Sequence, residues 1–85
     1  MTVTVLYFAR LREAFGVSGE QIELPETVRD VTALVRWLRE RGGAWEAELA
    51  GTRTVRAAVN QVMAVGDAGI KDGDEIAFFP PVTGG

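Results

Sequence analysis

The sequence contains no cysteine and no histidine. Without cysteine the chain cannot form a disulfide, offer a thiolate nucleophile, or bind an iron–sulfur cluster or structural zinc in the usual way. Without histidine it has no imidazole to transfer protons near neutral pH. A site of carboxylates alone stays open, yet Asp67, Asp72, Asp74 and Glu75 surround turn glycines and lack the spacing of a calcium loop. We therefore expect no bound metal, no bound cofactor and no stand-alone catalytic site.

Positive charge is also scarce, with 9 Lys and Arg residues against 12 Asp and Glu residues and a net charge of −3 at pH 7. Binding of nucleic acid requires a clustered basic face, so this balance argues against nucleic acid as the main partner and is compatible with a partner that has a basic docking surface. No apolar run approaches the ~20 residues that span a bilayer, and the N-terminus has no signal-peptide pattern. We expect a cytoplasmic protein with no membrane segment.

The hydrophobic content, 47% of 85 residues, is enough for one domain with a single core. Alternating side chains predict a first strand at residues 2–8, with Val3, Val5 and Tyr7 facing the core and Phe8 on the opposite face. Further strands are predicted at residues 20–24, 54–60, 62–65 and 75–79, with a turn near Asn60 and Gln61.

The main helix is predicted from the i, i+3, i+4, i+7 spacing of Val31, Leu34, Val35 and Leu38. Thr27 and Asp30 form a capping signal before it, and Gly42-Gly43 is expected to end it. Shorter helices are predicted at residues 9–15 and 44–49. Two further predictions concern the flanks of this helix: the three arginines form a solvated face, and the tryptophans are partly covered edges of the core (Arg36, Arg39, Arg41, Trp37, Trp45).

This element order predicts an α+β fold, a ubiquitin-like β-grasp in which a mixed sheet has one main helix across one face. The first and last strands would lie parallel in the centre of the sheet. The helix would cover the face of Val3, Val5, Tyr7, Ile76 and Phe78. Phe8 and Phe79 would then form an exposed apolar patch on the other face, and such patches mark interaction sites. We divide the chain into a domain at residues 1–79 and an extended tail at residues 80–85.

The last eight residues, FFPPVTGG, have the features of a stiff arm with a slim tip. Pro80 and Pro81 cannot donate hydrogen bonds to a sheet, and they hold the residues before them extended. Six extended residues reach roughly 20 Å. Gly84 and Gly85 have no side chains, so a narrow channel of another protein can close around them. The alternatives are a terminal stub without a role and a carboxylate held by the backbone amides of a partner.

Three segments carry a resemblance: DGDEIAFFPPVTGG (72–85), LYFARLRE (6–13) and AAVNQ (57–61). Together they make the chain similar to the small-subunit family of molybdopterin synthase. The resemblance implies a sulfur carrier. An adenylyltransferase like a ubiquitin-activating enzyme would use ATP and Mg²⁺ to adenylate Gly85, and a sulfur donor would convert the adenylate to a thiocarboxylate.

The resemblance further implies that the thiocarboxylate enters the large synthase subunit, in a heterotetramer, and gives its sulfur to a cyclic pyranopterin monophosphate on the way to molybdopterin. Catalytic side chains would belong to the partners, so this chain would be the sulfur-donating subunit of a transferase. The site residues implied are Gly85 as reactive group, Gly84 as clearance position, Phe8, Met63 and Phe79 as docking patch, Arg12 as a basic partner contact, and Pro80, Pro81, Val82 and Thr83 as the inserted arm.

Several alternatives stay open at this point. Met63 would otherwise be a core residue, and Arg12 a solvated helix charge. The carrier would otherwise serve thiamine synthesis or tRNA thiolation, although thiamine carriers are usually shorter and usually lack FFPPVTGG and a segment like GGAWEAELAG. In another class, the chain would be a ubiquitin-like modifier joined to lysines through Gly85.

Overall fold

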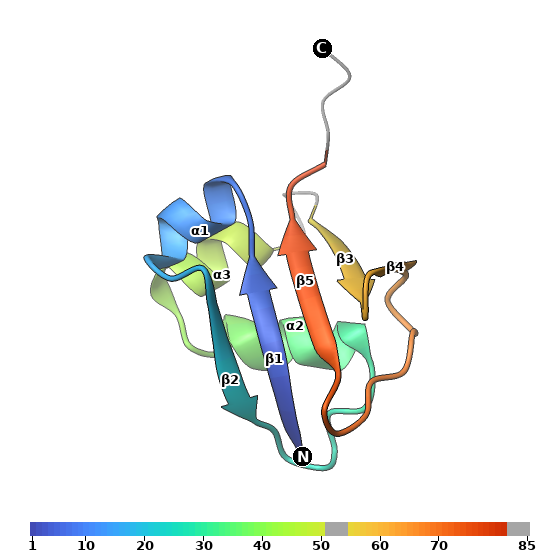
Figure 1. The fold of residues 1–85 in the computed structure, drawn as a ribbon. Helices are drawn as coiled ribbons and strands as arrows, with labels where there is room; N and C mark the ends of the chain where they lie inside the picture. The colour runs from blue at the N-terminus through green and yellow to red at the C-terminus, as the bar shows by residue number, and fades with distance from the viewer. Residues whose placement is uncertain (51–54, 82–85) are drawn as a thin grey trace.

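Across residues 1–50 and 55–81, which the computed structural model describes, the chain forms one five-stranded sheet and three helices (Figure 1). The elements in chain order are β1 (Thr2–Tyr7), α1 (Arg10–Phe15), β2 (Gly19–Glu23), α2 (Val31–Arg39), α3 (Gly43–Leu49), β3 (Arg56–Val59), β4 (Val62–Ala64) and β5 (Glu75–Phe79). Of these helices, none has the length and apolar character that crossing a bilayer requires.

The sheet has the order β2-β1-β5-β3-β4, so the first and last strands are neighbours in its centre. β1 and β5 pair in parallel, with Tyr7 beside Phe78, while the other neighbours pair antiparallel. The α2 helix crosses one face of this sheet (Figure 1). This arrangement confirms the predicted mixed sheet and the ubiquitin-like β-grasp fold.

The core lies between α2 and the covered face of the sheet. Val3, Val5 and Tyr7 of β1 are fully buried, as are Ile76 and Phe78 of β5. The helices meet them with the buried side chains of Leu11, Leu34, Leu38 and Leu49. Because alternate residues of a strand point to opposite faces, burial of this set leaves the intervening residues on the other face. The predicted core face is therefore confirmed.

The prediction that Thr27 caps the main helix is wrong. The N-cap is Asp30, whose backbone is extended and whose Oδ1 accepts a hydrogen bond of 2.8 Å from the Ala33 amide. Residues 25–28 instead close a turn in which the Val28 amide donates to the Pro25 carbonyl. The glycines after α2 also differ from expectation, because Glu40 already caps α2, Gly42 caps α3, and Gly43 is the first residue of α3.

The turn between β3 and β4 confirms the prediction at Asn60 and Gln61. Both residues have positive φ angles, 50° and 70°, which fit the two-residue turn of a tight hairpin. The Asn60 side chain holds this turn to the start of β5, accepting from the Glu75 amide and donating to Asp74. Residue 54, the predicted start of β3, lies outside the described residues, and the strand runs from Arg56.

A polar network joins β1, β2 and the loop after α2. The Tyr7 hydroxyl donates a 2.7 Å hydrogen bond to Oε2 of Glu20, and Arg41 binds both oxygens of the same carboxylate at 2.7 and 3.1 Å. The Arg41 guanidinium also lies over the rings of Trp37 and Trp45, 5.4 and 5.0 Å from their centroids. Arg41 is exposed, as predicted, but Glu20 and the two rings also hold it, which was not predicted. Both tryptophans are partly covered, as predicted.

Replacement of Glu20 tests this network. Partial burial alone would raise the pKa of Glu20, but the hydrogen bonds from Arg41 and Tyr7 outweigh it and lower the pKa below its ordinary value of 4.5. A carboxyl group with a lowered pKa stabilises the fold above that value, and this contribution is lost as pH falls through the lowered pKa. We expect Glu20→Gln to reduce the free energy of unfolding by about 1 kcal/mol near pH 7 and by progressively less in acid.

Urea unfolding at a series of pH values measures this difference. Glu26→Gln is the matched control, because Glu26 is exposed and its carboxylate accepts no hydrogen bond within residues 1–50 and 55–81. A difference between wild type and Glu20→Gln that stays constant from neutral to acid pH would contradict the proposed charge on Glu20.

Candidate functional site

The open face of the sheet carries a continuous apolar row. Pairing places Leu6 of β1 beside Ala77 of β5, Ala77 beside Ala58 of β3, and Ala58 beside Met63 of β4. Within the described residues, Leu6 belongs neither to the core cluster nor to the apolar side chains packed against it, and Ala58 lies outside the cluster although it is only 8% exposed. The two alanines keep the middle of the row low between the larger side chains of Leu6 and Met63.

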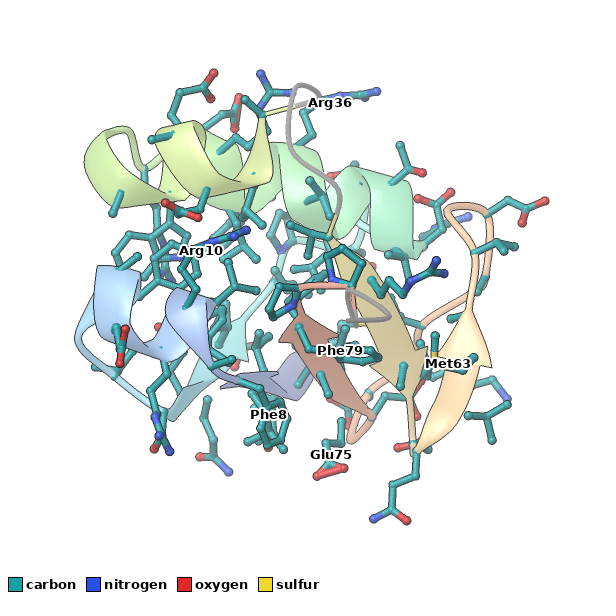
Figure 2. All side chains as sticks on the ribbon, turned by 90° about the horizontal axis from the view of Figure 1, so that it is seen from above. Phe8, Arg10, Arg36, Met63, Glu75 and Phe79 are labelled. Carbon is teal, nitrogen blue, oxygen red and sulfur yellow. The ribbon has the colours of Figure 1, made fainter. Side chains whose placement is uncertain are left out.

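Two phenylalanines extend this row at the ends of the central strands. Phe8 follows β1 and its side chain is 47% exposed, while Phe79 ends β5 and is half-buried. Figure 2 shows Phe8, Phe79 and Met63 on the side of the sheet turned away from the helices. We call the surface of Leu6, Phe8, Ala58, Met63, Ala77 and Phe79 the open apolar face.

The placement of Met63 decides whether it is a surface residue of the docking patch or a core residue. Its side chain is 58% exposed, so the alternative of a core methionine is wrong. A flexible thioether side chain at the edge of an apolar surface can adapt to the shape of a partner. The structure thus brings together all three residues that the sequence pointed to as a docking patch, and their role in docking stays a prediction.

A tight turn follows Phe8. The Leu11 amide donates to the Phe8 carbonyl at 3.1 Å, which closes a turn with Ala9 at its first central position. Ala9 has φ 54° and ψ −127°, a conformation that glycine adopts at little cost and alanine resists. The chain therefore turns sharply after Phe8, between the end of β1 at Tyr7 and the start of α1 at Arg10.

Relief of this turn gives a stability prediction. Backbone strain of this kind costs on the order of 1–3 kcal/mol, and glycine loses roughly 0.5–1 kcal/mol through its greater freedom in the unfolded chain. We expect Ala9→Gly to raise the free energy of unfolding by about 1 kcal/mol, measured by urea unfolding. Ala47→Gly is the control, because Ala47 is exposed within α3, where the same change should destabilise. Destabilisation by Ala9→Gly would show that the turn is unstrained.

The tail starts at the same end of the sheet as Phe8. Because β1 and β5 are parallel, Phe8 and the half-buried Pro80 and Pro81 lie beyond neighbouring strand ends, and the Phe8 amide donates to the Phe78 carbonyl at 3.1 Å. Pro80 has no amide hydrogen, which explains why β5 ends at Phe79. The predicted arm residues Val82 and Thr83 and the predicted tip residues Gly84 and Gly85 lie outside the described residues.

The charged residues near this end have different roles. Arg10, which the sequence did not single out, ties α1 to α3 through a 3.0 Å contact between its Nε and Oε1 of Glu48. Arg12 is exposed, and its side chain makes no ion pair with the part of the chain that is described. Its contact with a partner stays a prediction.

The acidic residues before β5 serve the fold. Asp72 accepts a 2.7 Å hydrogen bond from the Thr2 amide, and Asp74 accepts one of 2.8 Å from the Lys71 amide. These contacts confirm the interpretation of Asp72 and Asp74 as turn residues. Within residues 1–50 and 55–81, no three His, Cys, Asp or Glu side chains are grouped so that they could hold a metal ion.

Known proteins resemble this chain over its full length. The ThiS family matches residues 5–85. The molybdopterin synthase sulfur carrier subunits of Haemophilus influenzae and Escherichia coli are each 39% identical, with 98% of this chain and 99% of the relative covered.

Solved structures agree with this result. A Pyrococcus furiosus protein assigned as molybdopterin converting factor subunit 1 has a TM-score of 0.80 and 39% identity, with 96% of this chain and 99% of that chain covered. A complex of subunits 1 and 2 of molybdopterin-converting factor from Helicobacter pylori matches with a TM-score of 0.67, 28% identity and full coverage of both chains. Small archaeal modifier protein 1 of Haloferax volcanii matches with a TM-score of 0.62 and 27% identity, covering 95% of this chain and 98% of that chain. The chain therefore belongs to the ThiS family, among its molybdopterin synthase sulfur carrier subunits.

Proposed function

We propose that this chain carries sulfur to the large subunit of molybdopterin synthase as a thiocarboxylate on Gly85. The observation that carries the proposal is the open apolar face, which lies at the end of β5 where the tail begins. A partner that covers this face holds the tail root at a fixed place, so the tail residues are directed into that partner. Full-length identity of 39% to sulfur carrier subunits supports the same assignment.

The proposed chemistry turns an inert carboxylate into a sulfur donor. The Gly85 carboxylate attacks the α-phosphate of ATP in the activating enzyme, with Mg²⁺, and releases pyrophosphate. A donor sulfur then displaces AMP from the acyl-adenylate, which leaves the thiocarboxylate. In the synthase, the thiocarboxylate sulfur attacks a side-chain carbon of the cyclic pyranopterin monophosphate and displaces an oxygen substituent from it. Water then cleaves the acyl–sulfur bond of the resulting thioester, which leaves the sulfur on the pterin and regenerates the free carboxylate. Two loaded carriers supply the two sulfur atoms of one dithiolene.

The side chains of this chain position the carrier and leave the chemistry to its partners. The open apolar face loses water on docking, and about 25 cal/mol per Å² of buried apolar surface favours the complex. The Helicobacter pylori complex of subunits 1 and 2 supports a large subunit as the partner here. We extend the proposal to a heterotetramer in the cytoplasm, with Arg12 at the rim of the contact.

Reconstitution tests the proposal. The chain, its activating enzyme, ATP and a sulfur donor should give a species whose intact mass has gained one oxygen-to-sulfur exchange. This species should then support molybdopterin formation with the large subunit and fail to support thiazole formation with the thiamine enzymes. Thiazole formation without molybdopterin formation would assign the carrier to the thiamine pathway, and the absence of a loaded species would overturn the sulfur-carrier proposal.

A second function has one observation in its favour. The likeness to small archaeal modifier protein 1 supports attachment of Gly85 to lysines, because the same acyl-adenylate can be attacked by an amine instead of sulfur. Lysine adducts formed with the activating enzyme and ATP, identified by peptide mass spectrometry, would show this use. Carriers for tRNA thiolation share the activation step, and a thiolation assay with tRNA distinguishes them.

A further inference from the structure

A groove lies on the helix side of the sheet, away from the open apolar face. It has a volume of about 480 Å³ and runs between α2 and the β3–β4 hairpin. Its floor is apolar, with Val31 and Val35 from α2 facing Ala57 and Ala64 from the two strands. Figure 2 shows Arg36 on this helix side, opposite the side of Phe8.

The charged residues that line this groove are all arginines: among its described lining residues are Arg36, Arg39 and Arg56 and no Asp or Glu, although the whole chain has a net charge of −3. Arg56 is paired with Phe79 in the sheet, so its side chain starts from the open face and Arg36 and Arg39 are the arginines on the helix side. Arg39 is held by Glu46 through contacts of 2.9 and 3.0 Å. Neither Arg36 nor Arg56 makes an ion pair with any other side chain in residues 1–50 and 55–81. The groove therefore favours a ligand that is acidic as well as apolar.

The strand beside the groove has an open edge. β4 is the last strand in the order β2-β1-β5-β3-β4 of the described sheet. Val62 and Val65, at and just after β4, are 68% and 73% exposed. In a two-residue hairpin the closing pair, here Val59 and Val62, is hydrogen-bonded, so the next residue, Met63, points its amide and carbonyl away from β3. Such an edge accepts a further strand.

We propose that an extended acidic segment of a partner protein adds to the sheet along β4. Its backbone pairs with Met63, and the side chains on its helix side include apolar ones that enter the groove against Val35 and Ala64 and a carboxylate that binds Arg36. A strand is the occupant that uses all three features at once: the unpaired edge, the apolar floor and the positive charge of Arg36. This site lies beyond the proposed sulfur transfer and does not depend on it.

A designed peptide tests the proposal. The blocked peptide Ser-Asp-Ser-Val-Ser-Asp-Ser, whose Asp and Val side chains share one face of a strand, is titrated into the ¹⁵N-labelled full chain, and the amides of Val35, Arg36, Met63 and Val65 should shift. Arg36→Glu should weaken binding roughly tenfold or more, because it replaces attraction by repulsion. Arg29→Glu is the matched control, since Arg29 is exposed, carries the same charge and is absent from the groove lining. Urea unfolding checks that both variants fold.

A second variant separates strand addition from simple charge attraction. Met63→Pro removes the outward amide while leaving the amides that face β3, so it should abolish peptide binding. Four outcomes would overturn the proposal: no shifts with the peptide, equal affinity of wild type and Arg36→Glu, the same shifts with inorganic phosphate alone, or self-association of the free chain through β4. The first two outcomes would show that no such peptide site exists. The third would show a site for anions in general, and the fourth would show that a second copy of this chain binds along β4.

Discussion

Removal of Gly85 is expected to reduce molybdopterin formation by at least ~100-fold, because misplacement of a reacting group by about 1 Å can already cost this much. The deletion moves the terminal carboxylate to Gly84, about 3.5 Å short of its place in the activating enzyme and the synthase. No residue of the core cluster changes, so the free energy of unfolding should stay within about 0.5 kcal/mol of wild type. The rate is measured in the reconstituted synthase with the pyranopterin precursor.

Addition of one glycine after Gly85 is the complementary variant. It leaves every existing residue in place but moves the carboxylate forward by the same distance, so it should fail in adenylation as the deletion does. Glu26→Gln, an exposed change at the opposite end of the domain from the tail root, should retain the full rate. If the deletion keeps more than a tenth of the rate, the Gly85 carboxylate is not the reactive group.

Phe79→Asp should weaken binding of the large subunit by about 2–4 kcal/mol, or roughly 30- to 1000-fold, because it places an unpaired carboxylate in an apolar contact. Folding should suffer less. Phe79 is half-buried and lies outside the core cluster of the described residues, and its neighbour on β3 is Arg56, which can pair with the new aspartate. We expect a loss of about 1 kcal/mol in the free energy of unfolding.

Titration calorimetry with the large subunit and urea unfolding of the free chain measure these two quantities. Val62→Asp is the matched control, because Val62 is 68% exposed and its register position puts it on the sheet face opposite Met63. Loss of cooperative unfolding in the Phe79→Asp variant would show that Phe79 belongs to the core. Equal binding by the Phe79 variant and wild type would remove the open apolar face from the docking contact.

Local sequence patterns predicted the elements that depend on local rules. Alternation located β1 and β5 and assigned Val3, Val5 and Tyr7 to the core, while the four-residue stripe located α2. The FFPPVTGG ending indicated where the sheet ends, because a proline without an amide hydrogen cannot continue β5. Of the site, Phe8 and Phe79 followed from the same alternation, and Met63 entered through family resemblance.

Features that depend on contacts between residues distant in the chain could not be predicted from the sequence. Glu20 and Arg41 are 21 residues apart, and their contact requires the loop after α2 to return to β2. The row of Leu6, Ala77, Ala58 and Met63 requires the register of four strands, which no single strand encodes. The groove beside α2 depends on how the helix crosses the sheet. Thr27 was misassigned because Thr27 and Asp30 are both residue types that cap helices, and the turn that starts at Pro25 leaves Asp30 as the residue before α2.

The central position of β5 has a consequence for how the chain is made. The hairpin of β1 and β2 and the hairpin of β3 and β4 touch the same strand between them, and that strand is the last one synthesised. Contacts this distant in sequence form late in folding, since a long loop must close first. In a nascent chain the two hairpins therefore stay unjoined in the sheet until Glu75–Phe79 leaves the ribosome. A chain that stops before β5 cannot join the two hairpins into one sheet. Only chains that extend at least to the root of the tail can therefore complete the fold.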